Sequence, residues 1–417
     1  MRREAPVHSI VYRSPYPRDV FACSPGILAL PSGRLVATID LGGPGMDKIE
    51  GPKGIRYNEP VFGKIFISDD HGDSWRFVSD FPFMHARPFY AGGRVYVLGQ
   101  CMDLMVIASD DDGETWGPAA QLTQGEDWHQ APCNVWHSKG NVYLVMERRP
   151  PHDCTAWGVS VIAPVLMRGA EQDDLTLREN WTFATELVFR EMVDLNETHL
   201  FGMPMYRVPR ADAIDVGGGR YCAPLVWLET NVVQITDPKH IWYDETGCTF
   251  HLFSRAHTGH TNYACVLKVV EQPDGQMITQ FERAPSGERW LYLPWPGGQM
   301  KFHMLYDQET KTYWLLSTQA TDSAIRPECM PPQRFGLPDN ERRRLQLHFS
   351  KNCIDWCFAA LVDAGDSEQQ SRHYASMCIH GKDLYVLSRS GDEWTQSAHN
   401  CDMTTFHIIH DFRRLIY

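Results

Sequence analysis

Two near-identical octapeptides, SDDHGDSW at Ser68–Trp75 and SDDDGETW at Ser109–Trp116, decide the fold of this chain. Both read Ser-x-Asp-x-Gly-x-Ser/Thr-Trp. The Asp can accept hydrogen bonds from turn amides, the Gly suits a positive φ, and the Trp can pack beneath the loop. A calcium loop built on Asp69, Asp70 and Asp73 would lack the Glu that an EF-hand requires at its twelfth position. The pattern therefore predicts a structural turn between two strands.

A second repeat surrounds these octapeptides, in which a turn is followed by alternating apolar and aromatic residues. Its six copies are SGRLVAT (from Ser32), GGRVYVL (Gly92), KGNVYLV (Lys139), TGCTFHL (Thr246), TKTYWLL (Thr310) and GKDLYVL (Gly381). Each copy follows another apolar stretch, so each pair predicts a β-hairpin. Six hairpins without convincing helical periodicity predict an all-β protein, a six-bladed β-propeller. The octapeptides then fall between the third and fourth strands of a blade.

The predicted organisation is one catalytic propeller domain over residues 1–417, with loop insertions around residues 150–220. The spacing between hairpins is widest before the fourth copy. There, MRGAEQDDLTLRENWTF (167–183) and the Gly-rich RVPRADAIDVGGGRY (207–221) are interpreted as parts of long loops.

Composition narrows the function. The net charge of −13 argues against a nucleic-acid partner. No run of about 18 apolar residues suggests a membrane span, and the first residues lack the apolar core of a secretory signal. We therefore expect a cytoplasmic protein, unless a secretory leader has been trimmed. The 12 cysteines are scattered and form no Cys-x-x-Cys pair, which favours free thiols over a disulfide framework.

Candidate site residues stand at the starts of the predicted inner strands, which a propeller brings together around one end of its channel. All six predicted blades place ionisable or amide side chains there, and such groups are costly to bury unless they are paired or line a wet pocket. The candidate substrate-binding residues are Arg87, His85, Lys301, Arg344, Arg389, Asn231 and Asp402. The candidate catalytic residues are Glu229, His129, Glu147, Tyr374 and His399.

Further segments carry a family resemblance along nearly the whole chain. In order they are SPGILALPSGRLVA, HQAPCNVWHSKGNVYLVME, NWTFATEL, WLETNVV, WPGGQMKFHMLYDQETKTYWLLS and AHNCDMTTFHIIHDFR. Together with the octapeptides, which match the Asp-box (BNR repeat), they resemble a bacterial branch of the sialidase-like superfamily, the exo-α-sialidase family branch. SKNCIDW at Ser350–Trp356 looks like a third, shortened box without the Gly. The resemblance implies a six-bladed propeller whose boxes lie on the rim, away from a central pocket.

The same resemblance implies a carbohydrate substrate. A sialidase needs three arginines around the substrate carboxylate, a Tyr/Glu nucleophile pair and an Asp acid/base. Here the usual Phe-Arg-Ile-Pro opening is absent, and His373-Tyr374-Ala375-Ser376-Met377 replaces a pattern that resembles Gln-Tyr-Val-Asp-Trp in relatives. Arg87, Arg343 or Arg344, and Arg389 are the candidates for the arginine cluster.

Chemistry assigns provisional roles to the catalytic candidates. Glycosidic cleavage needs a proton donor and a nucleophilic group on opposite sides of the bond. Glu229 and Glu147 supply carboxylates, and His129 and His399 carry protons near neutral pH. Tyr374 is a nucleophile if a neighbouring carboxylate takes its proton.

Three functions follow. The first is an exo-acting glycoside hydrolase that removes a terminal acidic sugar. The second is a polysaccharide lyase that cleaves a uronate-linked glycan by β-elimination, and the third is a non-catalytic glycan-binding propeller. No cofactor is expected, and no metal either, since a zinc pair at His257 and His260 would lack a second ligand pair of fixed spacing. The oligomeric state stays open.

Overall fold

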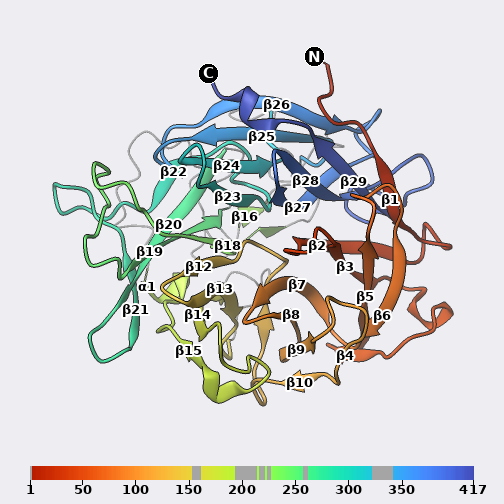
Figure 1. Cartoon of the computed structure of the whole chain (residues 1–417), viewed down its shortest axis with the longest axis horizontal. Helices are drawn as coiled ribbons and strands as arrows, with labels where there is room; N and C mark the ends of the chain where they lie inside the picture. The colour runs from red at the N-terminus through yellow and green to blue at the C-terminus, as the bar shows by residue number, and fades with distance from the viewer. Residues whose placement is uncertain are drawn as a thin grey trace.

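Six antiparallel sheets are arranged around a central axis, which confirms the predicted six-bladed β-propeller (Figure 1). The computed structural model describes residues 2–152, 161–192, 214–215, 221–222, 227–256, 262–321 and 341–417. The first strand of each blade lies next to the axis, and the later strands follow outward. Five of the predicted hairpins connect the first and second strands. The fourth prediction is wrong in its first strand, because residues 239–245 form turns and the strand that pairs with β19 (Thr249–Arg255) is β18 (Leu228–Val233).

Blades one to three occupy the first half of the chain. Blade one contains β2 (Phe21–Ala29), β3 (Leu35–Gly42), β5 (Glu59–Ser68) and β6 (Arg76–Phe81), with β4 (Gly54–Arg56) paired to β5 and η1 at Met46–Lys48. Blade two contains β7 (Met84–Ala91), β8 (Arg94–Cys101), β9 (Asp103–Ser109) and β10 (Ala120–Gln121). Blade three contains β11 (Trp128–His129), β12 (Trp136–Ser138), β13 (Asn141–Arg148), β14 (Ala163–Ala170) and β15 (Trp181–Phe183), with η3 at Arg178–Asn180.

Blades four to six complete the ring. Blade four contains β18 (Leu228–Val233), β19 (Thr249–Arg255), β20 (Tyr263–Glu271), β21 (Met277–Phe281) and β22 (Tyr292–Pro294). Blade five contains β23 (His303–Asp307), β24 (Thr312–Ser317), β25 (Arg344–Ser350) and β26 (Cys357–Ala364). Blade six contains β27 (Arg372–His380), β28 (Asp383–Ser390) and β29 (Met403–Ile409), followed by η6 (Phe412–Leu415). Outside the blades are α1 (Phe189–Met192) and a ribbon of β16 (Ile214–Asp215) and β17 (Tyr221–Cys222).

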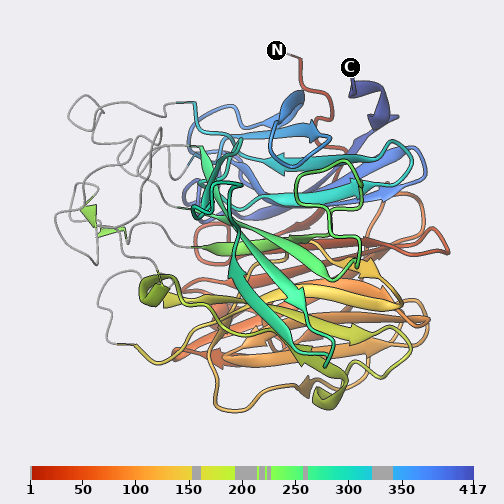
Figure 2. The ribbon, with the colours of Figure 1, turned by 90° about the vertical axis from the view of Figure 1, so that its left-hand side faces the viewer.

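The two ends of the chain close the ring in blade six. β1 (Ser9–Arg13) pairs antiparallel with β29 and forms the outermost strand of that blade. Both termini consequently lie at the same outer edge of the ring (Figures 1 and 2). Closure protects the blades from exposing long unpaired edges. The apolar core lies between blades, as where Phe406 of β29 packs edge-on against Trp75, with ring centroids 5.3 Å apart.

The octapeptides form the turns between β5 and β6 and between β9 and β10, where the sequence predicts them. Asp70 accepts hydrogen bonds from the backbone N–H and the hydroxyl of Ser74, at 2.9 and 2.6 Å. Asp111 makes the same two contacts with Thr115, at 2.8 and 2.6 Å. These bonds lower the pKa of Asp70 and of Asp111 to about 2, because they stabilise the charged carboxylate. Both Asp side chains thus hold their own turns together.

The shortened third copy behaves in the same way, between β25 and β26. Asn352 replaces the Asp, and its side-chain oxygen accepts hydrogen bonds from the N–H groups of Ile354 and Asp355, at 2.9 and 2.8 Å. An amide oxygen therefore performs the structural role of the carboxylate.

Residues 167–183 belong to blade three, which corrects their interpretation as a loop insertion. They contain the end of β14, a turn over 171–180, and β15, which pairs with β14. Because the turn is long and polar, the short fourth strand that follows it could not be recognised in the sequence. The second stretch, 207–221, lies largely outside the described residues, so the wider expectation of insertions around 150–220 stays a prediction.

Candidate functional site

Unusual backbone conformations mark one end of the central channel. Ser24, His85, Glu229 and Tyr374 all have positive φ values, of 24°, 56°, 57° and 50°. Each lies near the start of the first strand of its blade, at an irregularity in the pairing with the second strand. Non-glycine residues in the left-handed region cost about 1–3 kcal/mol each and cluster at functional sites. Four blades thus carry such a residue at the same position, facing one region.

Tyr374 is the centre of the half formed by blades four to six. Its hydroxyl accepts a hydrogen bond from Arg255 Nη1 at 2.9 Å, and the same Nη1 lies 3.1 Å from Glu229 Oε2. The guanidiniums of Arg342 and Arg389 lie 5.4 and 5.6 Å from the centroid of the Tyr374 ring. Burial raises the pKa of Tyr374 to about 12, with contributions from the charge of Glu229 and a hydrogen bond to it. The phenol is therefore neutral at pH 7 and lies beside a carboxylate.

The half formed by blades two and three holds two imidazoles and a second carboxyl group. Glu147 Oε2 lies 3.2 Å from His129 Nδ1, and its Oε1 accepts hydrogen bonds from the N–H and hydroxyl of Thr230, at 3.1 and 3.2 Å. The His85 ring meets His129 edge-on, with centroids 5.0 Å apart. Its Nδ1 lies 2.5 Å from Gln100 Nε2.

Burial favours the uncharged forms of the carboxyl group and the two imidazoles in this second half. It raises the pKa of Glu147 well above its ordinary value, and the nearby charge of Glu229 adds to the effect. It lowers the pKa of His129 and of His85 well below 6.5. Burial therefore favours the uncharged form of each group, a protonated carboxyl group and a neutral imidazole. Such a pair can donate one proton and take it back.

The structure also brings in residues that the sequence analysis missed. Arg255 and Arg342 contact Tyr374. For the arginine cluster, the sequence predicted Arg343 or Arg344, which follow Arg342 directly in the chain, and it did not point to Arg255. Asp40, in β3, accepts a hydrogen bond from the backbone N–H of His85 at 3.2 Å, and burial raises its pKa to about 7. The signal that could have found Arg255 and Asp40 is their place near the end of a second strand. That strand runs antiparallel to the first, so its end lies beside the start of the first strand.

Several predicted residues border this cluster. His399 is exposed; its carbonyl accepts a hydrogen bond from Arg389, and its Nδ1 lies 2.7 Å from the Asn400 side chain. The charge of Arg389, followed by that of Arg342, lowers the pKa of His399 to about 3. Asp402 is buried 3.6 Å from Arg13, and burial raises its pKa to about 6. Their catalytic and binding roles stay predictions.

Other predicted residues lie farther from Tyr374 or contact the scaffold. Asn231 ties blade four to blade five, since its side chain bonds to the Phe302 carbonyl and the Met304 N–H, at 3.2 and 3.1 Å. Arg344 contacts Thr321 and Glu341, at 2.8 and 3.1 Å.

Two buried cations stand deeper along the channel. Lys301 donates to the Ala375 carbonyl at 2.6 Å, and Arg87 to that of Val145 at 3.1 Å. As substrate-binding residues, all four of Asn231, Arg344, Lys301 and Arg87 stay predictions.

Other features of the chain complete the description. No helix among the described residues is long and apolar enough to span a membrane. Nine of the cysteines in the described ranges are free thiols. Among the same residues, no group of three His, Cys, Asp or Glu side chains is arranged to hold a metal ion. His257 and His260 lie outside the described residues.

Solved structures share this fold over nearly the whole chain. A Hadza microbial sialidase is 13% identical, with a TM-score of 0.55 over 94% of this chain and 66% of that one. A Trypanosoma rangeli sialidase bound to the inhibitor DANA is 12% identical, with a TM-score of 0.53 over 95% of this chain and 56% of that one. A Penicillium chrysogenum α-L-arabinanase complexed with arabinobiose is 12% identical, with a TM-score of 0.51 over 99% of both chains.

These comparisons establish the architecture. The protein is a six-bladed β-propeller of the sialidase type, and the predicted resemblance to sialidase-like propellers is confirmed at the level of the fold. The chain spans less than two thirds of the length of the two sialidases. Neither a known protein family nor a curated protein matches the sequence.

Proposed function

We propose that this protein is a glycoside hydrolase that removes a terminal sugar bearing a carboxylate, with Tyr374 and Glu229 as its nucleophile pair. The observation that carries the proposal is the convergence of Glu229, Arg255 and Tyr374 at one point near the channel axis. The fold neighbours support it, because their names describe sialidases and an arabinanase.

A phenol suits an anionic substrate better than a carboxylate does. Two negative charges brought together in a buried site repel each other strongly. Tyr374 is neutral before attack, so it can approach the anomeric carbon without opposing a substrate carboxylate. As the bond forms, Glu229 takes the phenolic proton and a covalent glycosyl-tyrosine results. Tyrosine nucleophiles of this kind are characteristic of sialidases.

Three guanidinium groups lie around the same phenol. Arg255 bonds to its hydroxyl, and Arg342 and Arg389 lie over its ring. Guanidinium groups bind carboxylates through paired, charge-assisted hydrogen bonds. This arrangement supports a sugar whose carboxylate lies close to the carbon that reacts.

The Glu147–His129 pair supplies the proton for the leaving group in this proposal. It belongs to blade three, which lies across the ring from blade six, whose strand β27 carries Tyr374 (Figure 1). The two groups lie 3.2 Å apart, and burial favours the form in which the carboxyl group holds the proton that is donated. After the leaving group departs, the deprotonated pair can accept a proton from the attacking water.

Fluorogenic glycosides test the proposal. The wild-type protein should release 4-methylumbelliferone from an N-acetylneuraminide or a glucuronide, and not from an arabinofuranoside. Tyr374→Phe and Glu229→Gln should each lower kcat by on the order of 10³-fold. Tyr385→Phe is the matched control, because the Tyr385 hydroxyl lies on β28 near His71, outside the cluster.

A trapping experiment identifies the nucleophile directly. A fluorinated acidic glycosyl fluoride should add its glycosyl mass to the protein, and peptide mapping should place that mass on Tyr374. An adduct on a carboxylate, or full activity in Tyr374→Phe, would contradict the assignment. Turnover of the arabinofuranoside alone would contradict the acidic substrate.

The neutral His85–His129 pair favours a second candidate, a uronate lyase. A neutral imidazole can remove the proton beside a uronate carboxylate, while an arginine neutralises that carboxylate. β-Elimination leaves an unsaturated product that absorbs in the near ultraviolet. An absorbance increase on uronate glycans, without release of the fluorophore, would select the lyase. No turnover by either assay would select a binding propeller.

A further inference from the structure

The far half of the central channel contains a cavity of about 760 Å³. The first strands pass the Tyr374 cluster and then this cavity. β7 reaches it beyond His85, and β27 reaches it beyond Tyr374. Its size lies within the roughly 300–1,000 Å³ of ordinary small-molecule sites. The cavity therefore forms a second chamber on the same axis.

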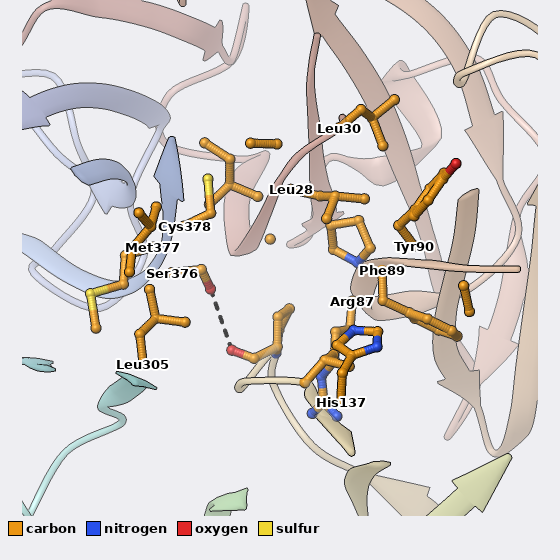
Figure 3. Close-up of a pocket in the computed structure, with 18 of the residues that line it drawn as sticks. Leu28, Leu30, Arg87, Phe89, Tyr90, His137, Leu305, Ser376, Met377 and Cys378 are labelled. Carbon is orange, nitrogen blue, oxygen red and sulfur yellow. Dashed lines mark hydrogen bonds between the residues drawn. The ribbon is translucent and has the colours of Figure 1, made fainter. Parts of the chain in front are cut away.

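Most of its wall is apolar. Leu28 and Phe89 line one side, and Leu305, Met377 and Cys378 line the other (Figure 3). The polar groups of the wall divide into two sets. One set, with His137 and Glu171, belongs to the hairpin turns at the outer end. The other lies at the inner end.

Arg87 is the main polar group of that inner end. It is 2% exposed and its Nη1 donates to the Val145 carbonyl at 3.1 Å. Its Nε and Nη2 are buried without a hydrogen-bond partner among the described residues. His303 lies across the channel in β23. Its Nδ1 is also buried, and no described residue forms a hydrogen bond with it. Unpartnered buried donors of this kind are rare and costly, and call for an explanation.

The charge balance points the same way. Burial lowers the pKa of His303, and the charges of Lys301 and Arg87 lower it further, so the three side chains share one region. Lys301 bonds only to neutral groups, the carbonyls of Tyr374 and Ala375 and the hydroxyl of Ser376. Within the described ranges no carboxylate forms an ion pair with Arg87 or Lys301. Burial lowers the pKa of both cations, and the charges of Glu147 on Arg87 and of Glu229 on Lys301 offset only part of that effect. A buried cation without an adjacent counter-ion is strongly unfavourable, and an anion in the chamber would offset that cost.

We propose that this chamber binds a small monocarboxylate with an apolar tail. The carboxylate lies at the inner end of the chamber, beside Arg87 and His303, and the tail extends between Leu28, Phe89 and Met377 towards the outer end. The polarity of the walls sets this direction. A ligand turned the other way would bring its carboxylate to Glu171 and leave Arg87 unpaired. The site is independent of the proposed hydrolysis, since it occupies the opposite half of the channel.

Calorimetric titration of the full-length protein with straight-chain carboxylates tests the proposal. From butanoate to octanoate, the Kd should fall by about fourfold for each added methylene, as expected for burying an alkyl chain. 1-Octanol, which has the tail without the charge, should bind at least about tenfold more weakly than octanoate. Acetate and chloride, which lack the tail, should bind weakly or not at all.

Variants separate the two ends of the chamber. Arg87→Met keeps the aliphatic stem and should weaken octanoate on the order of 10–100-fold, with little effect on 1-octanol. Leu28→Trp fills the apolar part and should abolish octanoate binding while fluorogenic glycosides are still turned over. Arg76→Met is the matched control, because Arg76 is exposed and pairs with Glu114 at 2.9 Å on the rim.

Three outcomes would overturn the proposal. In the first, the wild-type protein shows no saturable binding of octanoate. In the second, octanol and octanoate bind with the same affinity, and in the third, chloride binds as tightly as octanoate. The wild-type series remains decisive even if Arg87→Met fails to fold. If Tyr374→Phe loses hydrolysis but still binds octanoate, the proposed hydrolytic site and the proposed carboxylate site are independent of each other.

Discussion

The two octapeptide turns provide a matched pair of glycine substitutions. Gly72 and Gly113 occupy the same position of the motif, with φ values of +90° and +86°. A Cβ atom at Gly72 would lie 2.0 Å from Cε1 of Phe406, whereas one at Gly113 would have its nearest contact at 3.5 Å, to Val36 Cγ2. Both alanine variants therefore suffer backbone strain, but only one also collides with a buried ring.

The expected losses of stability follow from these contacts. Gly113→Ala should cost about 1–2 kcal/mol, which is the cost of placing a Cβ in a left-handed conformation. Gly72→Ala should cost a further 1–3 kcal/mol, roughly, because the Phe406 ring must move within the packing between blades six and one. The total for Gly72→Ala is then about 2–5 kcal/mol.

Equilibrium unfolding in urea measures the difference. For a chain of 417 residues, 1 kcal/mol changes Tm by only about 1 °C, so denaturant midpoints resolve the variants better. The double variant Gly72→Ala/Phe406→Leu should lose less stability than the sum of its two single changes, because the obstacle to the new methyl group is gone. Equal losses in Gly72→Ala and Gly113→Ala would refute the argument. They would show that contact with Phe406 does not decide the choice of glycine.

Two further predictions concern titration. Burial raises the pKa of Asp40 to about 7 from an unfolded value of about 3.9, so the folded state holds a proton that the unfolded state releases between these values. Stability should fall as pH rises from 4 to 7, and Asp40→Asn should remove up to about 4 kcal/mol of that dependence in urea unfolding at pH 4 and 7.5; an unchanged slope would contradict the assignment. Arg389→Met should raise the pKa of His399 from about 3 towards its ordinary value, because Arg389 is the largest cause of the depression. An NMR titration of the His399 ring measures the change, and a ring that stays uncharged at pH 5 would contradict it.

The propeller could be predicted from the sequence because its hairpins are local. Most predicted hairpins join neighbouring strands through a short turn, as at Gly92 and Gly93 between β7 and β8, whereas in blade four the long segment 234–248 separates β18 from β19. The turn residues and the alternation of apolar and polar side chains that define a hairpin occur within one short, contiguous stretch of sequence. The polar turn at 171–180 was harder to assign to a blade from the sequence. Only the short strand β15 that follows it shows that the chain remains in blade three.

The site was only partly predictable because it depends on strand register. Glu229 and Tyr374 stand at strand starts, a position that the hairpin pattern fixes to within a few residues. Arg255 stands at the other end of its hairpin, where it pairs with Leu228. Arg342 lies two residues before β25 and reaches Tyr374 in the next blade. Contacts between blades have no signature in a single sequence, so Arg342 could not be distinguished from the adjacent Arg343 and Arg344.

The rigid rim and the strained inner strands are two parts of one design. A left-handed Glu229 or Tyr374 relaxes to a lower-energy conformation unless its surroundings hold it, and each costs about 1–3 kcal/mol. The strands that carry them are covered on both faces by neighbouring blades. Asp70, Asp111 and Asn352 fasten outer turns of blades one, two and five. In blades one and two, the octapeptide turn belongs to the same sheet as a left-handed residue of the first strand, Ser24 or His85. The bulge in each strand turns one polar side chain towards the axis, where Tyr374 and Glu229 meet. The octapeptides therefore stabilise the outer turns of two blades whose first strands carry strained residues near the axis.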